Sequence, residues 1–189
     1  MNASMYVDAP DRKRGRMYIS GPGGGVRGEH RVSGTLPTGV DHLRMILGHH
    51  VWATLRLIDR CLKLSPDQLG LSTPGTYGSI HATLAHLVLG DAGFQRWIED
   101  LEVRCPSQPG PPPPVATLRA DMERQARRWR ELLDREDQLA ATNVGLLLTQ
   151  AVHHGAEHRT HVCSILGAHG LHVPDLSGWE YIRSSGMPP

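Results

Sequence analysis

The stretch AVHHGAEHRTHV, residues 151–162, carries four histidines in a run that has the periodicity of an α-helix. His154 and His158 are four residues apart, so on a helix they lie one turn apart on the same face. His161 continues that face, whereas His153 points about 100° away from it. Two imidazoles placed in this way can converge on one cation. The stretch therefore predicts a helix and raises the hypothesis of a metal site.

Spacing alone is weak evidence for a metal. The chain has 12 histidines among 189 residues, and chance gives roughly 0.7 pairs at this spacing. Solvated or capping histidines on a polar face are the alternative interpretation. A metal site also needs a third ligand from another helix, and residues 77–101 offer two candidates. His86 lies among apolar neighbours, where a histidine without a partner is costly, while His81 lies nearer the helix start and is expected to be solvated.

Four stretches have apolar residues at helical spacing, and they cover residues 38–64, 77–101, 115–134 and 142–169. Thr38 and Asp41 resemble a capping box, and Gly170 suits a C-cap. Prolines forbid helix between the second and third stretches, and no convincing strand pattern appears. The sequence predicts an all-α four-helix bundle over residues 39–189, with connections long enough to cross over. Trp179 and Tyr181 are expected to pack the C-terminal tail onto this bundle.

The first part of the chain differs in composition from the rest. Residues 1–38 are rich in glycine and poor in large apolar groups, so they are expected to be a disordered leader, with Met17 as an alternative start. They carry six basic and three acidic groups, net +3, whereas the remainder carries 14 basic and 16 acidic groups, net −2. A slightly acidic folded part is a poor nucleic-acid binder, because that affinity depends on neutralising phosphates.

Cysteine usage and hydropathy indicate the compartment. The three cysteines, Cys61, Cys105 and Cys163, are odd in number and form no C-x-x-C motif, so a disulfide framework is not expected. The N-terminus has no apolar signal region, and no window approaches the roughly 18 apolar residues of a membrane span. These features predict a soluble cytoplasmic protein without a membrane or nucleic-acid partner.

Four segments together resemble the DinB/YfiT-like family of metal-binding four-helix bundles. They are listed here in chain order: HHVWATLRLIDRCLKLSPDQL (49–69), GSIHATLAHLVLGDAGFQRWIE (78–99), AVHHGAEHRTHVCSILGAHGL (151–171) and VPDLSGWEYI (173–182). The resemblance covers about residues 39–183. It implies His86, His154 and His158 as the metal ligands, and Arg159 matches the arginine that commonly follows the last of them. His161 stands where glutamine is more usual, so its role as a bystander, a supporting group or an extra ligand stays open.

Three neutral imidazoles leave a divalent ion its full charge and an open coordination position, the arrangement of catalytic rather than structural sites. The ion can be Zn, Ni or Fe, since imidazole suits all three. The resemblance implies a metal-dependent transferase that joins a low-molecular-weight thiol, such as mycothiol or bacillithiol, to an electrophilic small molecule. Arg159 or His161 would support this catalysis, and the family pattern admits a homodimer. Two alternatives stay open: a hydrolase that uses metal-bound hydroxide, and a non-catalytic metal-binding stress-response protein.

Each metal-bound imidazole also needs an acceptor for its second ring nitrogen. Glu157 and Asp91 are the candidates that the sequence offers as these hydrogen-bond acceptors.

Overall fold

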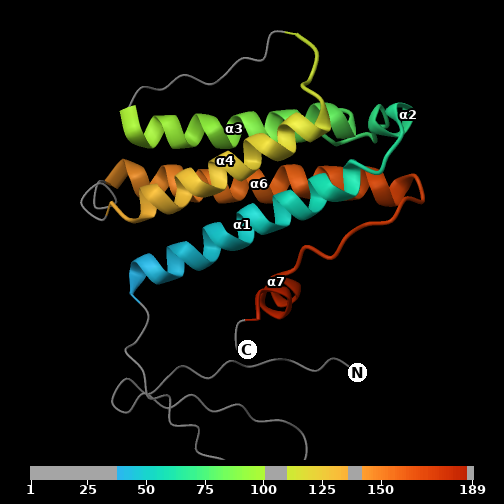
Figure 1. Cartoon of the computed structure of the whole chain (residues 1–189). Coiled ribbons are helices and arrows are strands. Elements are labelled where there is room, and N and C mark those ends of the chain that lie inside the picture. The colour runs from blue at the N-terminus through green and yellow to red at the C-terminus, as the bar shows by residue number, and fades with distance from the viewer. Residues whose placement is uncertain (1–37, 101–109, 136–141, 187–189) are drawn as a thin grey trace, which may run out of the picture. The chain divides into compact units, whose positions relative to one another are not determined.

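The computed structural model describes residues 38–100, 110–135 and 142–186. Within these ranges the elements are all helices: α1 (Gly39–Cys61), α2 (Pro66–Leu69), α3 (Ile80–Asp100), α4 (Val115–Leu133), α6 (Thr142–Ala168) and α7 (Gly178–Ser185) (Figure 1). The all-α prediction is confirmed. No helix of the described ranges has the length and apolar character needed to cross a membrane. The predicted disordered leader, with Met17, falls outside these ranges apart from Thr38.

The ends of the helices follow local capping rules. Thr38 and Asp41 form the predicted capping box, with the Asp41 backbone N–H donating to the Thr38 hydroxyl over 3.2 Å. Gly170 has a φ of +66°, the left-handed conformation expected of a residue that ends α6. The predicted start of the second long helix at Tyr77 is wrong. That helix begins at Ile80, because the Ser79 hydroxyl accepts a hydrogen bond from a backbone N–H of its first turn.

The four long helices pack along one another. α1 packs against α4 and α6, and α3 also packs against α4 and α6, so α1 and α3 lie diagonally across from each other. Figure 1 shows that α3 and α4 run in one direction while α1 and α6 run in the opposite direction. α3 and α6 form the most extensive of these contacts. This pairing brings the histidines of the second predicted helix next to those of the fourth.

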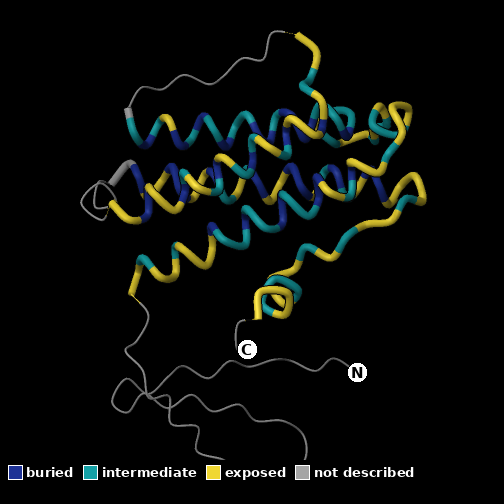
Figure 2. The backbone as a smooth tube through the Cα atoms, viewed as in Figure 1, coloured by how far each residue is buried: buried dark blue, intermediate teal, exposed yellow. Residues whose placement is uncertain are grey.

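The buried apolar residues form two clusters, one toward each end of the long helices. They include Leu57, Leu84, Met122 and Ile165 in the first cluster, and Leu47, Trp129, Leu132 and Leu148 in the second. Figure 2 shows the buried positions on the faces that the long helices turn toward each other. Several polar side chains are also buried, among them His50, Asp91 and Arg159. Their positions along α1, α3 and α6 fall between the two apolar clusters, so a polar layer crosses the middle of the core.

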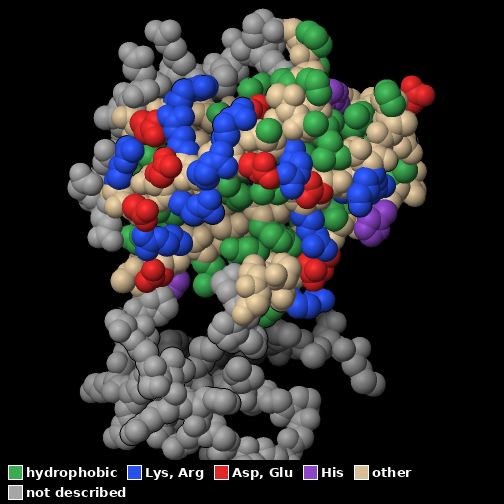
Figure 3. All heavy atoms as spheres, viewed as in Figure 1, with side chains coloured by type: hydrophobic (Ala, Val, Ile, Leu, Met, Phe, Trp, Pro, Cys, Tyr) green, Lys and Arg blue, Asp and Glu red, His purple; other side chains and the backbone are tan. Residues whose placement is uncertain are grey.

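The outer face of α4 carries charges of both signs. In Figure 3, Lys and Arg side chains alternate with Asp and Glu side chains across the face turned to the viewer. Arg119 pairs with Asp59, and Arg128 pairs with Glu99. Paired surface charges of this kind contribute little to stability.

The C-terminal segment packs onto α1 through Tyr181. Its ring lies 5.4 Å from that of Trp52 and 5.6 Å from that of His49, centroid to centroid. The His49 Nε2–H donates to the backbone carbonyl of Leu176 over 2.8 Å. The prediction that Trp179 also packs inward is wrong, because this side chain is 76% exposed. Residues two apart on a helix point to nearly opposite sides, so α7 cannot bury both aromatic rings against one surface.

Candidate metal centre

Three histidines from two helices converge at the contact between α3 and α6. His86 comes from α3, and His154 and His158 lie one turn apart on α6. One ring nitrogen of each lies within 4.8 Å of those of the other two. The Nε2 atoms of His86 and His154 are 3.1 Å apart. Two nitrogens at Zn–N distances of about 2.0–2.1 Å on a tetrahedral ion would be about 3.3 Å apart, so this pair fits a shared cation.

A glycine on α3 makes room for one of these rings. A Cβ atom at Gly90 would lie 2.5 Å from Cε1 of His154, closer than real atoms approach. The edge-to-face contact of Phe94, at 5.4 Å between ring centroids, holds the same imidazole from another side. Glycine in a helix costs about 1 kcal/mol relative to alanine. At position 90 the absence of a side chain leaves the space that the His154 imidazole occupies.

Replacing Gly90 with alanine is therefore expected to weaken metal binding by about 10–100-fold, the range seen when the support of a metal ligand is disturbed. A competition titration against a chromophoric chelator measures this change. Gly145→Ala is the matched control, because a Cβ atom there meets nothing within 4 Å. That variant should keep its metal affinity and gain up to about 1 kcal/mol of stability from helix propensity. Equal affinity in both variants would contradict the role assigned to Gly90.

Tyr77 is a part of the centre that the sequence analysis missed. Its hydroxyl lies 3.0 Å from Nδ1 of His86, and its ring stacks on the same imidazole at 4.2 Å. It also meets His158 edge to face at 5.1 Å. The hydroxyl oxygen can accept a hydrogen bond from Nδ1–H, which leaves the Nε2 lone pair of His86 free for a metal. No signal in the sequence marks this residue, because it precedes α3 and reaches the cluster only through the fold of its loop.

Neither Asp91 nor Glu157 accepts a hydrogen bond from the second ring nitrogen of a ligand histidine, although the sequence had suggested that they would. Both oxygens of Asp91 are engaged by other residues, at 2.9 Å from Nε2 of His50 and 2.9 Å from Nε1 of Trp129. Glu157 is exposed and makes no hydrogen bond to the cluster within the described residues. Nδ1 of His158 is buried and has no hydrogen-bond partner in the part of the chain that the structure describes. A buried ring nitrogen without a hydrogen bond fits an imidazole whose partner is a metal ion.

His161 adjoins the cluster without belonging to it. Its ring centroid is 5.4 Å from that of His158, and its Nδ1 atom is also buried and unpaired within the described ranges. Among the described residues, the ring nitrogens that lie within reach of one cation are those of His86, His154 and His158. His161 therefore lies next to the ligand His158 but outside the set of ligands. His81, by contrast, lies apart, with Nε2 donating to the carbonyl of Pro113 over 2.7 Å rather than facing solvent.

The surroundings favour the neutral form of these imidazoles. Burial lowers the pKa of His86. Burial and then the neighbouring imidazoles lower the pKa of His154 to about 4, and the same two causes lower the pKa of His158 to about 4. All three rings therefore keep a free lone pair at neutral pH. Metal binding at this pH needs no proton to be displaced from the ligands.

Arg159 belongs to a buried polar network on the α1 side of α6. Its Nη1 donates to Nδ1 of His50 at 3.1 Å and to the Thr54 hydroxyl at 3.0 Å. Because a guanidinium only donates, His50 must accept at Nδ1 and donate from Nε2 to Asp91. The other oxygen of Asp91 accepts from Trp129, so the network ties together all four long helices. Burial lowers the pKa of Arg159 to about 10, which leaves the side chain a cation at neutral pH.

The chain was compared with protein-family models, with curated proteins and with solved structures. None of them matched. The candidate metal centre consists of three imidazoles from two packed helices, and a glycine leaves room for one of them, that of His154.

Proposed function

We propose that this chain is a DinB/YfiT-like four-helix bundle that binds one divalent transition-metal ion and activates a low-molecular-weight thiol for transfer to an electrophilic small molecule. The observation that carries the proposal is the convergence of His86, His154 and His158. Three neutral ligands leave the ion its full charge and a position for an exogenous ligand. The order and spacing of the segments that resemble the family support the thiol as that ligand.

A thiol as the nucleophile requires less of the surroundings of the cluster than a water molecule does. A bound cation lowers the pKa of a thiol enough to hold it as thiolate at neutral pH, without help from a base. Activation of water for attack on an amide generally also uses a general base within hydrogen-bond reach. Within the described residues no carboxylate hydrogen-bonds to the three imidazoles, so the hydrolase alternative would have to use His161, which lies beside His158, as its base.

The cluster is also accessible from outside. Tyr77, which covers His86, is 52% exposed, and His86 and His154 are themselves only partly buried. A small thiol could therefore approach by displacement of one aromatic side chain rather than by opening of the core. In this proposal the protein residues hold the ion, Tyr77 orients His86, and His161 lies beside the reacting groups. Zn, Ni and Fe are the candidate ions, since imidazole nitrogen binds all three.

Cobalt substitution tests the thiol directly. The Co(II)-loaded protein should develop a thiolate-to-cobalt charge-transfer band in the near ultraviolet when mycothiol, bacillithiol or mercaptoethanol is added. The band should be absent in His154→Ala and unchanged in His153→Ala, an exposed neighbour on the same helix. The loaded protein should then speed conjugation of the thiol with chlorodinitrobenzene, where an S–C bond forms, chloride leaves and the thiol proton passes to solvent.

Cobalt retained without a thiolate band for any of the three thiols would contradict thiol activation and leave a metal-binding protein. Hydrolysis of an amide by the loaded protein, without a thiolate band, would instead assign the open position to water.

A further inference from the structure

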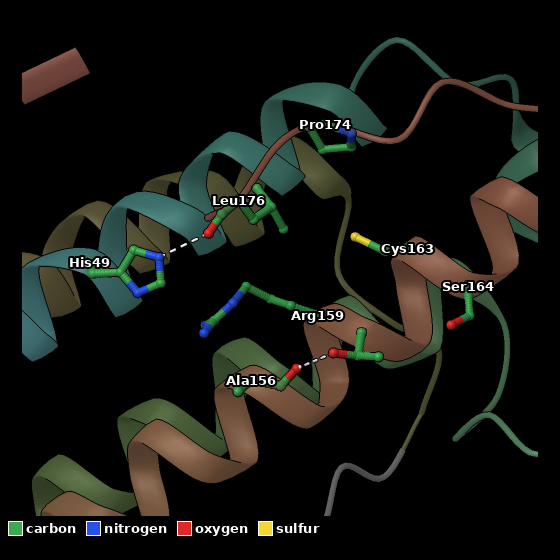
Figure 4. Close-up of a pocket in the computed structure, with 8 residues that line it drawn as sticks. His49, Ala156, Arg159, Cys163, Ser164, Pro174 and Leu176 are labelled. Carbon is green, nitrogen blue, oxygen red and sulfur yellow. Dashed lines mark hydrogen bonds between the residues drawn. The ribbon is translucent and has the colours of Figure 1, made fainter. Parts of the chain in front are cut away.

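A pocket lies on the other side of α6 from the three histidines. It has a volume of about 450 Å³ and is bounded by α1, α6 and the segment that leads to α7. Its lining includes His49, Ala156, Arg159, Cys163, Pro174 and Leu176 (Figure 4). On a helix, residues 156, 160 and 163 point roughly opposite to residues 154 and 158. The pocket is therefore separated from the candidate metal centre by the width of one helix.

Arg159 brings a buried positive charge to this pocket. Figure 4 shows its side chain extending from α6 toward α1, beneath His49. The residue is 6% exposed, yet it lines both this pocket and an adjoining one of about 210 Å³. All the hydrogen bonds that its guanidinium donates within the described residues come from Nη1, to His50 and Thr54. Nε and Nη2, the other edge of the guanidinium, donate to no described residue.

The charge of Arg159 has no directly bonded counter-ion in the described part of the chain. Asp91, the carboxylate of the same network, is reached only through the imidazole of His50. The residues that line the two pockets include no aspartate and no glutamate. A buried cation without an opposite charge beside it is costly, and an anion placed on the free edge would offset that cost. The parallel N–H groups of an arginine edge match the two oxygens of a carboxylate.

We infer that this pocket binds a small molecule with a single carboxylate, held by Nε and Nη2 of Arg159, with its apolar part lying along Cys163, Pro174 and Leu176. Ala156, Cys163, Pro174 and Leu176 give the pocket an apolar wall that suits a hydrocarbon tail, and Thr160 and Ser164 add two hydroxyl groups to the lining. The arginine edge matches the oxygens of a phosphate as well, but inorganic phosphate has no hydrocarbon part to bury against the apolar wall. The site does not depend on the proposed metal, because the two sites occupy different faces of α6.

Hexanoate is the probe, and nuclear magnetic resonance of the full chain is the measurement. Titration of ¹⁵N-labelled protein should shift the Nε–H signal of Arg159 in a saturable way, with a dissociation constant on the order of 1 mM. Hexanamide, of the same shape but without charge, should shift this signal at least about tenfold more weakly, and so should inorganic phosphate. His154→Ala should bind hexanoate as the wild type does, because it alters only the other face of the helix.

Two variants locate the site. Arg159→Met removes the charge, and Ala156→Leu fills the pocket from an exposed position without touching the arginine network. Both should lose hexanoate binding by at least about tenfold. If Arg159→Met fails to fold, Ala156→Leu decides alone: loss of binding supports the site and unchanged binding overturns it. No saturable shift with hexanoate, or equal binding of hexanamide or of phosphate, would also overturn the inference.

Discussion

Alanine in place of His154 or of His86 is expected to abolish stoichiometric metal binding, although the two residues lie on different helices. The wild type, purified without a histidine tag, should carry about one divalent ion per chain, because three neutral imidazoles can bind one ion together. Removal of one ligand should lower the metal affinity by more than about 100-fold. Changes to residues that only orient a ligand lower the metal affinity by about 10–100-fold. Plasma mass spectrometry of both variants measures the loss.

The matched control for this experiment is His153→Ala. His153 directly precedes His154 on α6 but is exposed and stands outside the cluster. This variant should retain the ion, which separates a defined site from non-specific binding to a histidine-rich helix. Absence of metal from the wild type after incubation with Zn and Ni, or retention of metal in both ligand variants, would remove the basis for the proposed function.

Asparagine in place of Asp91 is expected to destabilise the protein by about 3 kcal/mol, since breaking a buried ionic network leaves a charge and donors unsatisfied. Asp91 accepts from both His50 and Trp129, whereas an asparagine of the same shape offers only one carbonyl oxygen. Its NH₂ group would face another donor, because His50 cannot release its Nε2 proton while Nδ1 accepts from Arg159. Urea denaturation followed by circular dichroism measures the change in unfolding free energy.

Asp134→Asn provides the surface comparison for this prediction. Asp134 pairs with Arg44 at 2.8 Å, but its side chain is 69% exposed. The loss of such a pair should change stability by less than about 1 kcal/mol. Similar small losses in both variants would show that the Asp91 network contributes no more than an exposed ion pair. The m-value should stay the same in both, because neither change alters the surface exposed on unfolding.

Much of the helical structure could be predicted from local patterns. The amphipathic repeats indicated the four long helices, and the capping residues Thr38 and Gly170 marked the start of α1 and the end of α6. The pairing of His154 with His158 is also local, because residues four apart share a helix face whatever surrounds them. The selection of His86 over His81 depended on the apolar neighbours of His86 and on the family resemblance, and the structure places His86 in the cluster.

Other parts of the site depend on how the helices meet. Asp91 belongs to the His50 network instead of supporting a ligand, and Arg159 turns to α1 although it follows His158 in the chain. Tyr77 reaches His86 from a loop, and Gly90 leaves space for an imidazole of α6.

The sequence by itself therefore determined which residues form helices and which side chains share a helix face, because both follow from backbone geometry repeated every 3.6 residues. Only the tertiary structure decided which faces meet, which polar groups pair in the core and which residues support the histidines. Those pairings join residues far apart in the chain, and they depend on the packing of several helices at once, which no local spacing encodes.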